Sequence, residues 1–93
     1  MEMIPGYRHD DWVSYSSKWV GRRVHLPFEI SPTDPRDKLI KDIKLPDGSR
    51  EIEFAPWQGF GKCHYYYKYD PVTGKILSFR YVEVNPGDCQ SPV

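Results

Sequence analysis

No apolar run in this sequence approaches the length needed to span a membrane. The chain also has no excess of either charge, because 13 lysines and arginines balance 13 aspartates and glutamates. Affinity for nucleic acid depends mainly on basic side chains, so this balance argues against a nucleic-acid partner and against an anionic membrane surface. The N-terminal residues carry no charged segment followed by an apolar stretch, so we expect no signal peptide here.

The sequence lacks the motifs of common catalytic and metal sites. Its three histidines, His9, His25 and His64, are scattered, and none stands in a metal-binding or catalytic-triad pattern. Its two cysteines have no CxxC spacing, and no glycine-rich loop is placed to hold a phosphate. We therefore expect a protein that is not an enzyme and that binds neither a metal nor a cofactor.

Aromatic residues and turn formers are what the sequence has in abundance. Hydrophobic residues make up only 39% of the 93 residues, but aromatic residues reach 15%, and each can bury a large area in one compact core. Nine prolines and seven glycines favour short strands and turns over long helices. We expect a single domain, 1–93, with an irregular N-terminal segment at 1–9 and a proline-rich loop at 31–37.

One helix is predicted near the N-terminus, starting at Asp10 or Asp11. Trp12, Tyr15 and Trp19 recur at i, i+3 and i+7, which places them on one helical face, and this aromatic stripe is expected to face the core. A glycine, Gly21, follows where helices commonly end.

Residues 38–56 predict a first β-hairpin. The turn is Pro46-Asp47-Gly48, in which proline presets φ and glycine accepts the left-handed conformation. Centring the strands on this turn predicts three cross-strand pairs: Leu45 with Ser49, Lys41 with Glu53, and Ile40 with Phe54.

Residues 63–84 predict a second hairpin around the turn at 70–74, and its first strand is rich in tyrosine. The register stays open between two alternatives. A four-residue loop pairs Tyr69 with Ile76, whereas a bulge joins the tyrosine face to Leu77, Phe79 and Tyr81. A shift of one residue exchanges the two faces of a strand, so the choice decides which tyrosines are buried.

Together these elements predict an α+β fold, in which one N-terminal helix packs on a three- to five-stranded antiparallel meander. Pairing of the last strands would bring the ends of the 63–89 segment together. We therefore expect a disulfide between Cys63 and Cys89 at the final hairpin, as is common in small exported domains. Two buried thiols in a cytosolic protein are the alternative.

Surplus aromatic residues indicate a binding surface. Successive strand residues point to opposite faces, so the tyrosines of the second hairpin cannot all be buried, and Tyr66 is the best candidate for exposure. Trp57 and Phe60, in a glycine-bearing connection, either cover the core or mark a contact surface. Because tyrosine, tryptophan and arginine are enriched where proteins bind each other, the candidate binding residues are Tyr66, Trp57, Phe60, His64 and Arg80.

The second hairpin resembles a known family. Its order is Cys63, an aromatic strand, Asp70, the run Thr73-Gly74-Lys75-Ile76, an apolar strand with Arg80, and Asp88-Cys89. This order is similar to the C-terminal half of small Gram-negative periplasmic lipoproteins of the BamE/SmpA-like type, and Trp19-Val20-Gly21-Arg22 resembles the segment that opens their domain.

The resemblance covers about residues 19–89. It departs at 25–37, which is proline-rich where the family has a helix, and the chain lacks the family's lipidated cysteine. The resemblance implies a place in the periplasm or cell envelope, a disulfide, a lipid anchor on the native precursor, and a role in binding other proteins.

The leading hypothesis is a small periplasmic protein-binding domain, either an envelope-assembly accessory or an immunity protein that neutralises a delivered effector. One alternative is a cytosolic phage-type inhibitor or interaction protein. The other is a carbohydrate-binding module that uses Trp57, Phe60 and Tyr66, since sugars stack on aromatic rings. The sequence leaves the partner's identity and the oligomeric state open.

Overall fold

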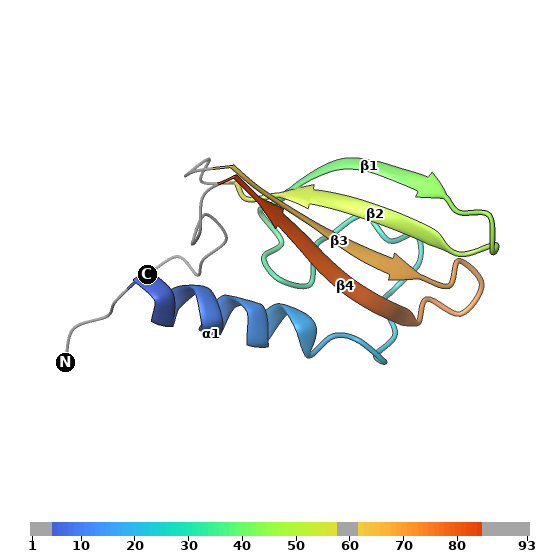
Figure 1. Ribbon diagram of the computed structural model, residues 1–93. Coiled ribbons are helices and arrows are strands. Elements are labelled where there is room, and N and C mark those ends of the chain that lie inside the picture. Colours follow the sequence, from blue (N-terminus) through green and yellow to red (C-terminus); the bar gives the residue numbers. More distant parts are fainter. Residues whose placement is uncertain (1–4, 58–61, 85–93) are drawn as a thin grey trace.

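The computed structural model describes the backbone of residues 5–57 and 62–84, and the side chains from residue 11 onward. The described elements are one helix and four strands: α1 (Pro5–Ser17), β1 (Lys38–Lys44), β2 (Arg50–Ala55), β3 (Cys63–Tyr69) and β4 (Ile76–Glu83). The strands form one antiparallel sheet in the order β1-β2-β3-β4. The helix lies along one face of this sheet (Figure 1), so the α+β class predicted from the sequence is confirmed.

The helix begins earlier than predicted. It starts at Pro5, so the expectation of an irregular segment over 1–9 is wrong for 5–9. Proline suits the first position of a helix, because its φ is already helical and its missing N–H would have had no partner there. The helix ends at Ser17, and the turn that follows contains Gly21 with a φ of 89°, a left-handed conformation that favours glycine.

The buried stripe of α1 also differs from the predicted one. Trp12 and Ser16 are buried, whereas Tyr15 is 42% exposed and lies beside the ammonium group of Lys18. Trp19, which lies beyond the helix, packs at the margin of the core. The small side chain of Ser16 on the inward face lets the sheet approach the helix closely. The backbone carbonyl oxygen of Ser16 accepts a hydrogen bond from the hydroxyl of Tyr67 in β3.

The first hairpin confirms two of its three predicted pairs. Lys41 lies opposite Glu53, and the Leu45 amide donates to the Ser49 carbonyl oxygen over 2.8 Å. The pairing of Ile40 with Phe54 is wrong, because the register shifts between Leu39 and Lys41 and places Leu39 opposite Phe54. One extra residue, Ile40, therefore forms a bulge in β1.

The second hairpin combines the two registers that the sequence left open. Its turn pairs Tyr69 with Ile76, and the register then shifts so that Tyr67 lies opposite Phe79 and Tyr65 opposite Tyr81. Leu77 is the extra residue of this bulge and is 43% exposed. The shift aligns two tyrosines, Tyr65 and Tyr67, with aromatic residues of β4, and this alignment builds part of the aromatic core.

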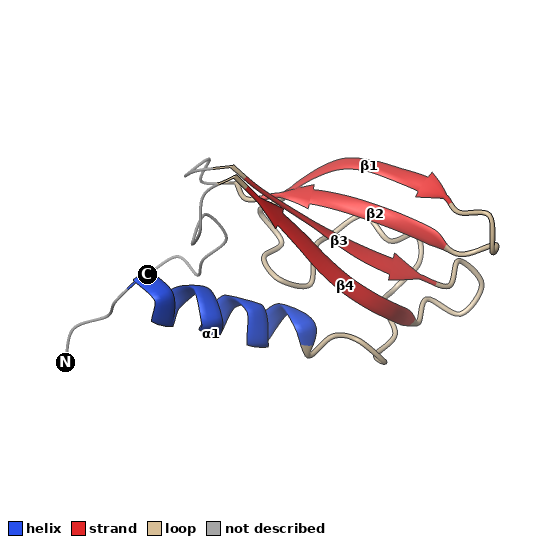
Figure 2. Cartoon of the chain, viewed as in Figure 1, coloured by secondary structure: helices blue, strands red, loops and turns tan. Residues whose placement is uncertain are grey.

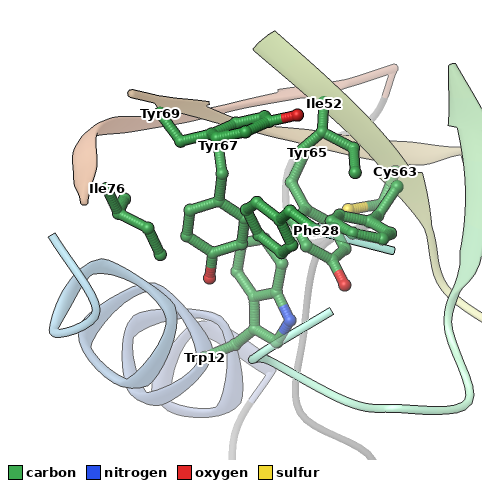
Figure 3. Close-up of a cluster of buried hydrophobic side chains, with 9 residues drawn as sticks. Trp12, Phe28, Ile52, Cys63, Tyr65, Tyr67, Tyr69 and Ile76 are labelled. Carbon is green, nitrogen blue, oxygen red and sulfur yellow. The ribbon is translucent and has the colours of Figure 1, made fainter. Parts of the chain in front are cut away.

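The core lies between the sheet and the segments that cover one of its faces (Figure 2). Trp12 reaches from α1 toward the tyrosines of β3, with its ring centroid 5.5 Å from that of Tyr65 (Figure 3). Phe28, from the segment between α1 and β1, lies 5.0 Å from the ring of Tyr69. The buried hydrophobic residues are Trp12, Phe28, Ile52, Phe54, Cys63, Tyr65, Tyr67, Tyr69 and Ile76.

The proline-rich loop at 31–37 is tied to this core by hydroxyl groups. The buried Ser31 shares a hydrogen bond with the Tyr65 hydroxyl. Thr33 Oγ1 shares one with the Tyr67 hydroxyl, with 2.7 Å between the two oxygens. The Tyr65 hydroxyl also donates to the carboxylate of Asp37, whose pKa is raised by burial. The loop therefore has a fixed place although it contains no helix or strand.

The disulfide predicted at the final hairpin requires a correction. Cys63 is buried, but Cys89 lies outside the described residues, and no cysteine pair lies at disulfide distance within the described part of the chain. The strand ladder places Glu83 opposite Cys63. The fold that the structure describes is one helix and a four-stranded antiparallel sheet.

Candidate functional site

The two faces of the sheet have different surroundings. In β3, residues 63, 65, 67 and 69 are buried beneath α1 and the 26–37 segment, whereas residues 64, 66 and 68 are half-buried on the other side. We call this second side the outer face. In the part of the chain that the structure describes, no helix or loop crosses it (Figure 2). The outer face is therefore an ordered surface, uncovered by the described segments, on which a partner could lie.

Tyr66 lies at the centre of the outer face, between its cross-strand neighbours on β2 and β4. The guanidinium carbon of Arg80 lies 3.8 Å from the centroid of the Tyr66 ring. Arg80 also makes a two-pronged contact with Glu51, in which Nε and Nη2 donate to the two carboxylate oxygens over 3.0 and 2.9 Å. This chain of contacts fixes the orientation of both the ring and the guanidinium before any partner arrives.

A second cluster adjoins the first and is centred on Glu53. This residue is only 5% exposed although it lies on the outer face, because its neighbours close over it. Its carboxylate contacts His64 Nδ1, and Lys41 Nζ lies 3.8 Å away. A buried carboxylate requires such partners, and burial and the nearby Glu53 raise the pKa of the Tyr66 hydroxyl.

Three of the five candidate binding residues come together on this face: Tyr66, His64 and Arg80. Trp57 lies elsewhere, since its indole Nε1 donates to Asp34 over 3.1 Å and its backbone amide donates to Asp37. Both partners belong to the loop that covers the inner side of the sheet. Phe60 falls outside the described residues.

Trp57 is 40% exposed, and the guanidinium carbon of Arg36 lies over its ring, 4.1 Å from the ring centroid. Arg36 in turn forms an ion pair with Asp34 at 3.0 Å, and the hydrogen bond from the Arg36 side chain lowers the pKa of that carboxyl group. Trp57 therefore fastens the 34–37 loop to the end of β2, and the structure does not place it beside Tyr66.

The charged members of the outer face were not singled out as site residues from the sequence. Glu51 and Glu53 alternate with apolar residues in the sequence, and the structure pairs each with a cation, Glu51 with Arg80 and Glu53 with Lys41. A signal existed for Glu53, because the hairpin turn correctly placed Lys41 opposite it. No comparable signal linked Glu51 to Arg80, which are 29 residues apart in the chain.

The chemistry available on the outer face is that of recognition. It presents an aromatic ring, a guanidinium and paired charges on rigid strands, and such groups bind planar or charged partners. Within residues 5–57 and 62–84, no group of three or more histidine, cysteine, aspartate or glutamate side chains could hold a metal ion.

The fold and this face define an α+β domain with one ordered, uncovered sheet surface. No protein-family model matches the chain, and no curated protein or solved structure matches it either. Of the described residues, none belongs to a helix with the length and apolar character needed to cross a membrane.

Proposed function

We propose that this domain binds another protein through the outer face of its sheet, with Tyr66 and Arg80 at the centre of the contact. The observation that carries the proposal is the pre-ordered stack of these two side chains on a face that no described segment covers. Tyrosine and arginine are among the residues that contribute most to protein interfaces, and the contribution is largest where they are rigid before binding.

The surroundings of the stack fit an interface better than a solvated charged surface. Val82 on β4 and Ile43 on β1 point to the same side of the sheet and are 52% and 43% exposed. The charged residues between them are largely compensated within the chain, so a partner would not have to neutralise a buried charge. A flat, mixed face of this kind resembles the core and rim of a protein–protein contact.

The carbohydrate-binding alternative is less well supported. Sugar platforms need aromatic rings that share a surface, but Trp57 is held by the loop on the inner side, whereas Tyr66 lies on the outer face. Each ring also carries a guanidinium on one side, so only the remaining side of each is open to a ligand.

The compartment and the biological role are proposed on the family resemblance alone. It favours the periplasm or cell envelope, with a role in envelope assembly or in neutralising a delivered effector. Fractionation of cells that express the native gene tests the compartment, and recovery of the protein only in the cytosol would contradict it.

The binding face is tested by site-specific photo-crosslinking in cells of the source organism. A photoreactive residue replaces Val82 on the outer face, and a matched variant carries it at Val72, a valine that is 84% exposed in the turn after β3. We expect one discrete adduct from position 82 that disappears when Tyr66→Ala is added, and none from position 72. Equal adducts from both positions, or an adduct from 72 alone, would contradict the proposal.

A further inference from the structure

We propose that the free edge of β1 binds an extended segment of another protein, in which acidic and apolar residues alternate, as a fifth strand of the sheet. This inference concerns a different surface from the outer face and does not depend on it. It rests on three observations: the free edge itself, the lysines along it, and an apolar groove beside it.

The two edges of the sheet are not equally open. The start of β4 is already paired with the segment that follows α1, since the Ile76 amide donates to the Arg22 carbonyl oxygen and the Gly21 amide to that of Ile76, both over 2.8 Å. A Cβ atom at Gly74 would collide with the carbonyl oxygen of Val24, so this pairing is close. Strand β1 is the opposite edge of the sheet, and in the described chain no segment forms backbone hydrogen bonds with the edge that points away from β2.

The backbone of β1 offers the groups that an added strand needs. The Leu45 amide points toward β2, because it bonds to Ser49. Backbone groups of an antiparallel strand alternate between its two sides, so the N–H and C=O groups of Asp42 and Lys44 point away from β2. The Asp42 carbonyl oxygen accepts a hydrogen bond from Arg50 Nη2 over 3.3 Å, and its second lone pair can accept another. Asp42 and Lys44 lie two residues apart, which is the spacing at which a further strand forms its hydrogen bonds.

The charge on the edge selects the partner. Strand β1 carries Lys38 and Lys41 on its outer face and Lys44 on its inner face. Lys41 lies 3.8 Å from Glu53, and among the described residues neither Lys38 nor Lys44 has an ion pair. Its single acidic residue, Asp42, is occupied on the inner side by Arg50 at 2.9 Å and by the Tyr69 hydroxyl at 2.6 Å. Acidic side chains directly opposite lysines stabilise neighbouring strands.

An open groove beside the edge would receive the other side chains of the segment. The groove has a volume of about 730 Å³ and lies under the inner side of β1. Its apolar lining includes Leu26, Phe28, Leu39 and Tyr69, and Glu29 and Asp42 also line it. Side chains of a strand alternate between faces. Apolar residues would therefore enter the groove, while acidic residues would lie on the outer side near Lys38 and Lys41, away from Glu29.

The probe is a capped synthetic peptide of about eight residues, slightly longer than a typical strand, that alternates glutamate and valine. A peptide that alternates lysine and valine is its matched control. We expect addition of the acidic peptide to the full chain to shift the Asp42 and Lys44 amide resonances and slow their exchange with solvent. The Tyr66 and Arg80 amides should be unaffected. The lysine peptide should produce neither effect.

Variants at two positions separate strand addition from simple charge attraction. Lys44→Pro removes one outward N–H without touching a bond to β2, and prolines are tolerated on edge strands. Lys44→Ala is its matched control, because it loses the same side-chain charge but keeps the N–H. We expect Lys44→Pro to bind about fivefold more weakly than Lys44→Ala, from the loss of one backbone hydrogen bond. Lys38→Glu should weaken binding by a similar factor.

Several results would overturn the proposal. They are the absence of any shift at Asp42 and Lys44 in the unmodified chain, equal binding of both peptides, or shifts confined to the outer face. The first would mean that the lysines only guard the edge against pairing. The resonance measurement needs no variant, so the test stands even if Lys44→Pro fails to fold.

Discussion

Strand β3 carries tyrosines on both of its faces, and the two faces use them differently. Tyr65 and Tyr67, on the inner face, are fully buried, and each hydroxyl is bonded to the loop or the helix that covers it. Tyr66, between them, is half-buried on the outer face and stacks on Arg80. The inner pair therefore joins distant parts of the chain, whereas Tyr66 is held ready on a surface that the described chain leaves uncovered.

The largest expected effect separates these roles through stability. Tyr67→Ala should lower the free energy of unfolding by about 3–5 kcal/mol, because it leaves a cavity in the aromatic core where Tyr67 packs 5.1 Å from Phe79. Tyr66→Ala, its neighbour, should cost about 1 kcal/mol or less, since its ring is partly solvated. Urea denaturation measures both, and equal losses would contradict the division between the faces.

Alternation in the sequence predicted part of this division, and turn chemistry predicted part of the sheet. The period of two in β3 indicated that Tyr66 faces away from its neighbours, and Pro46-Asp47-Gly48 fixed the pairing of Lys41 with Glu53. Both are local signals, since each depends on residues close together in the chain.

What the sequence could not predict depends on residues far apart or on single inserted residues. The bulge at Ile40 moved Leu39 opposite Phe54, although no turn residue marks it. The hydrogen bonds from Ser31 and Thr33 to the tyrosines of β3 each join residues 34 positions apart, and no spacing pattern in the sequence predicts them. The same limit explains why Glu51 and Arg80 were not recognised as a pair.

The next effect is a loss of stability at alkaline pH. Burial raises the pKa of Tyr67 to about 12 from an ordinary value of 10.0, and it also raises that of Tyr65. Ionisation therefore begins in the unfolded state, so the stabilisation is fully present below pH 10.0 and is lost as the pH rises toward 12. For Tyr67 alone, the loss reaches about 2–3 kcal/mol at about 1.4 kcal/mol per pH unit.

Absorbance at a wavelength specific to tyrosinate follows this ionisation. The buried tyrosines Tyr65 and Tyr67 should ionise only together with unfolding, because burial raises the pKa of both. Tyr67→Phe should reduce the steepness of the decline in stability above pH 10.0. A single titration step for all tyrosines, with no accompanying unfolding, would contradict the buried hydroxyl network.

A smaller effect isolates one hydroxyl group. Tyr65→Phe keeps the ring but removes the donor to Asp37 and the partner of the buried Ser31, so it should cost about 1–3 kcal/mol. Tyr66→Phe is the matched change on the outer face and should lie within about 0.5 kcal/mol of the parent. If Tyr66→Phe proved the more costly of the two, the assignment of the structural hydroxyl to the inner face would be wrong.

A change at Arg80 should have a small effect on stability and a large effect on binding. Its side chain is 54% exposed, so its pair with Glu51 should contribute about 1 kcal/mol or less to the free energy of unfolding. Arg80→Lys keeps the charge but loses the planar fork that meets both carboxylate oxygens and the flat group that lies on the Tyr66 ring.

We therefore expect Arg80→Lys to melt within a few degrees of the parent and to abolish most of the crosslinking from position 82. Lys68→Arg, a reverse exchange on the same outer face of β3, serves as the control and should leave the crosslink intact. Full crosslinking by Arg80→Lys would show that only positive charge is needed there. In that case the ordered stack on Tyr66 would be a structural contact of the sheet rather than the centre of an interface.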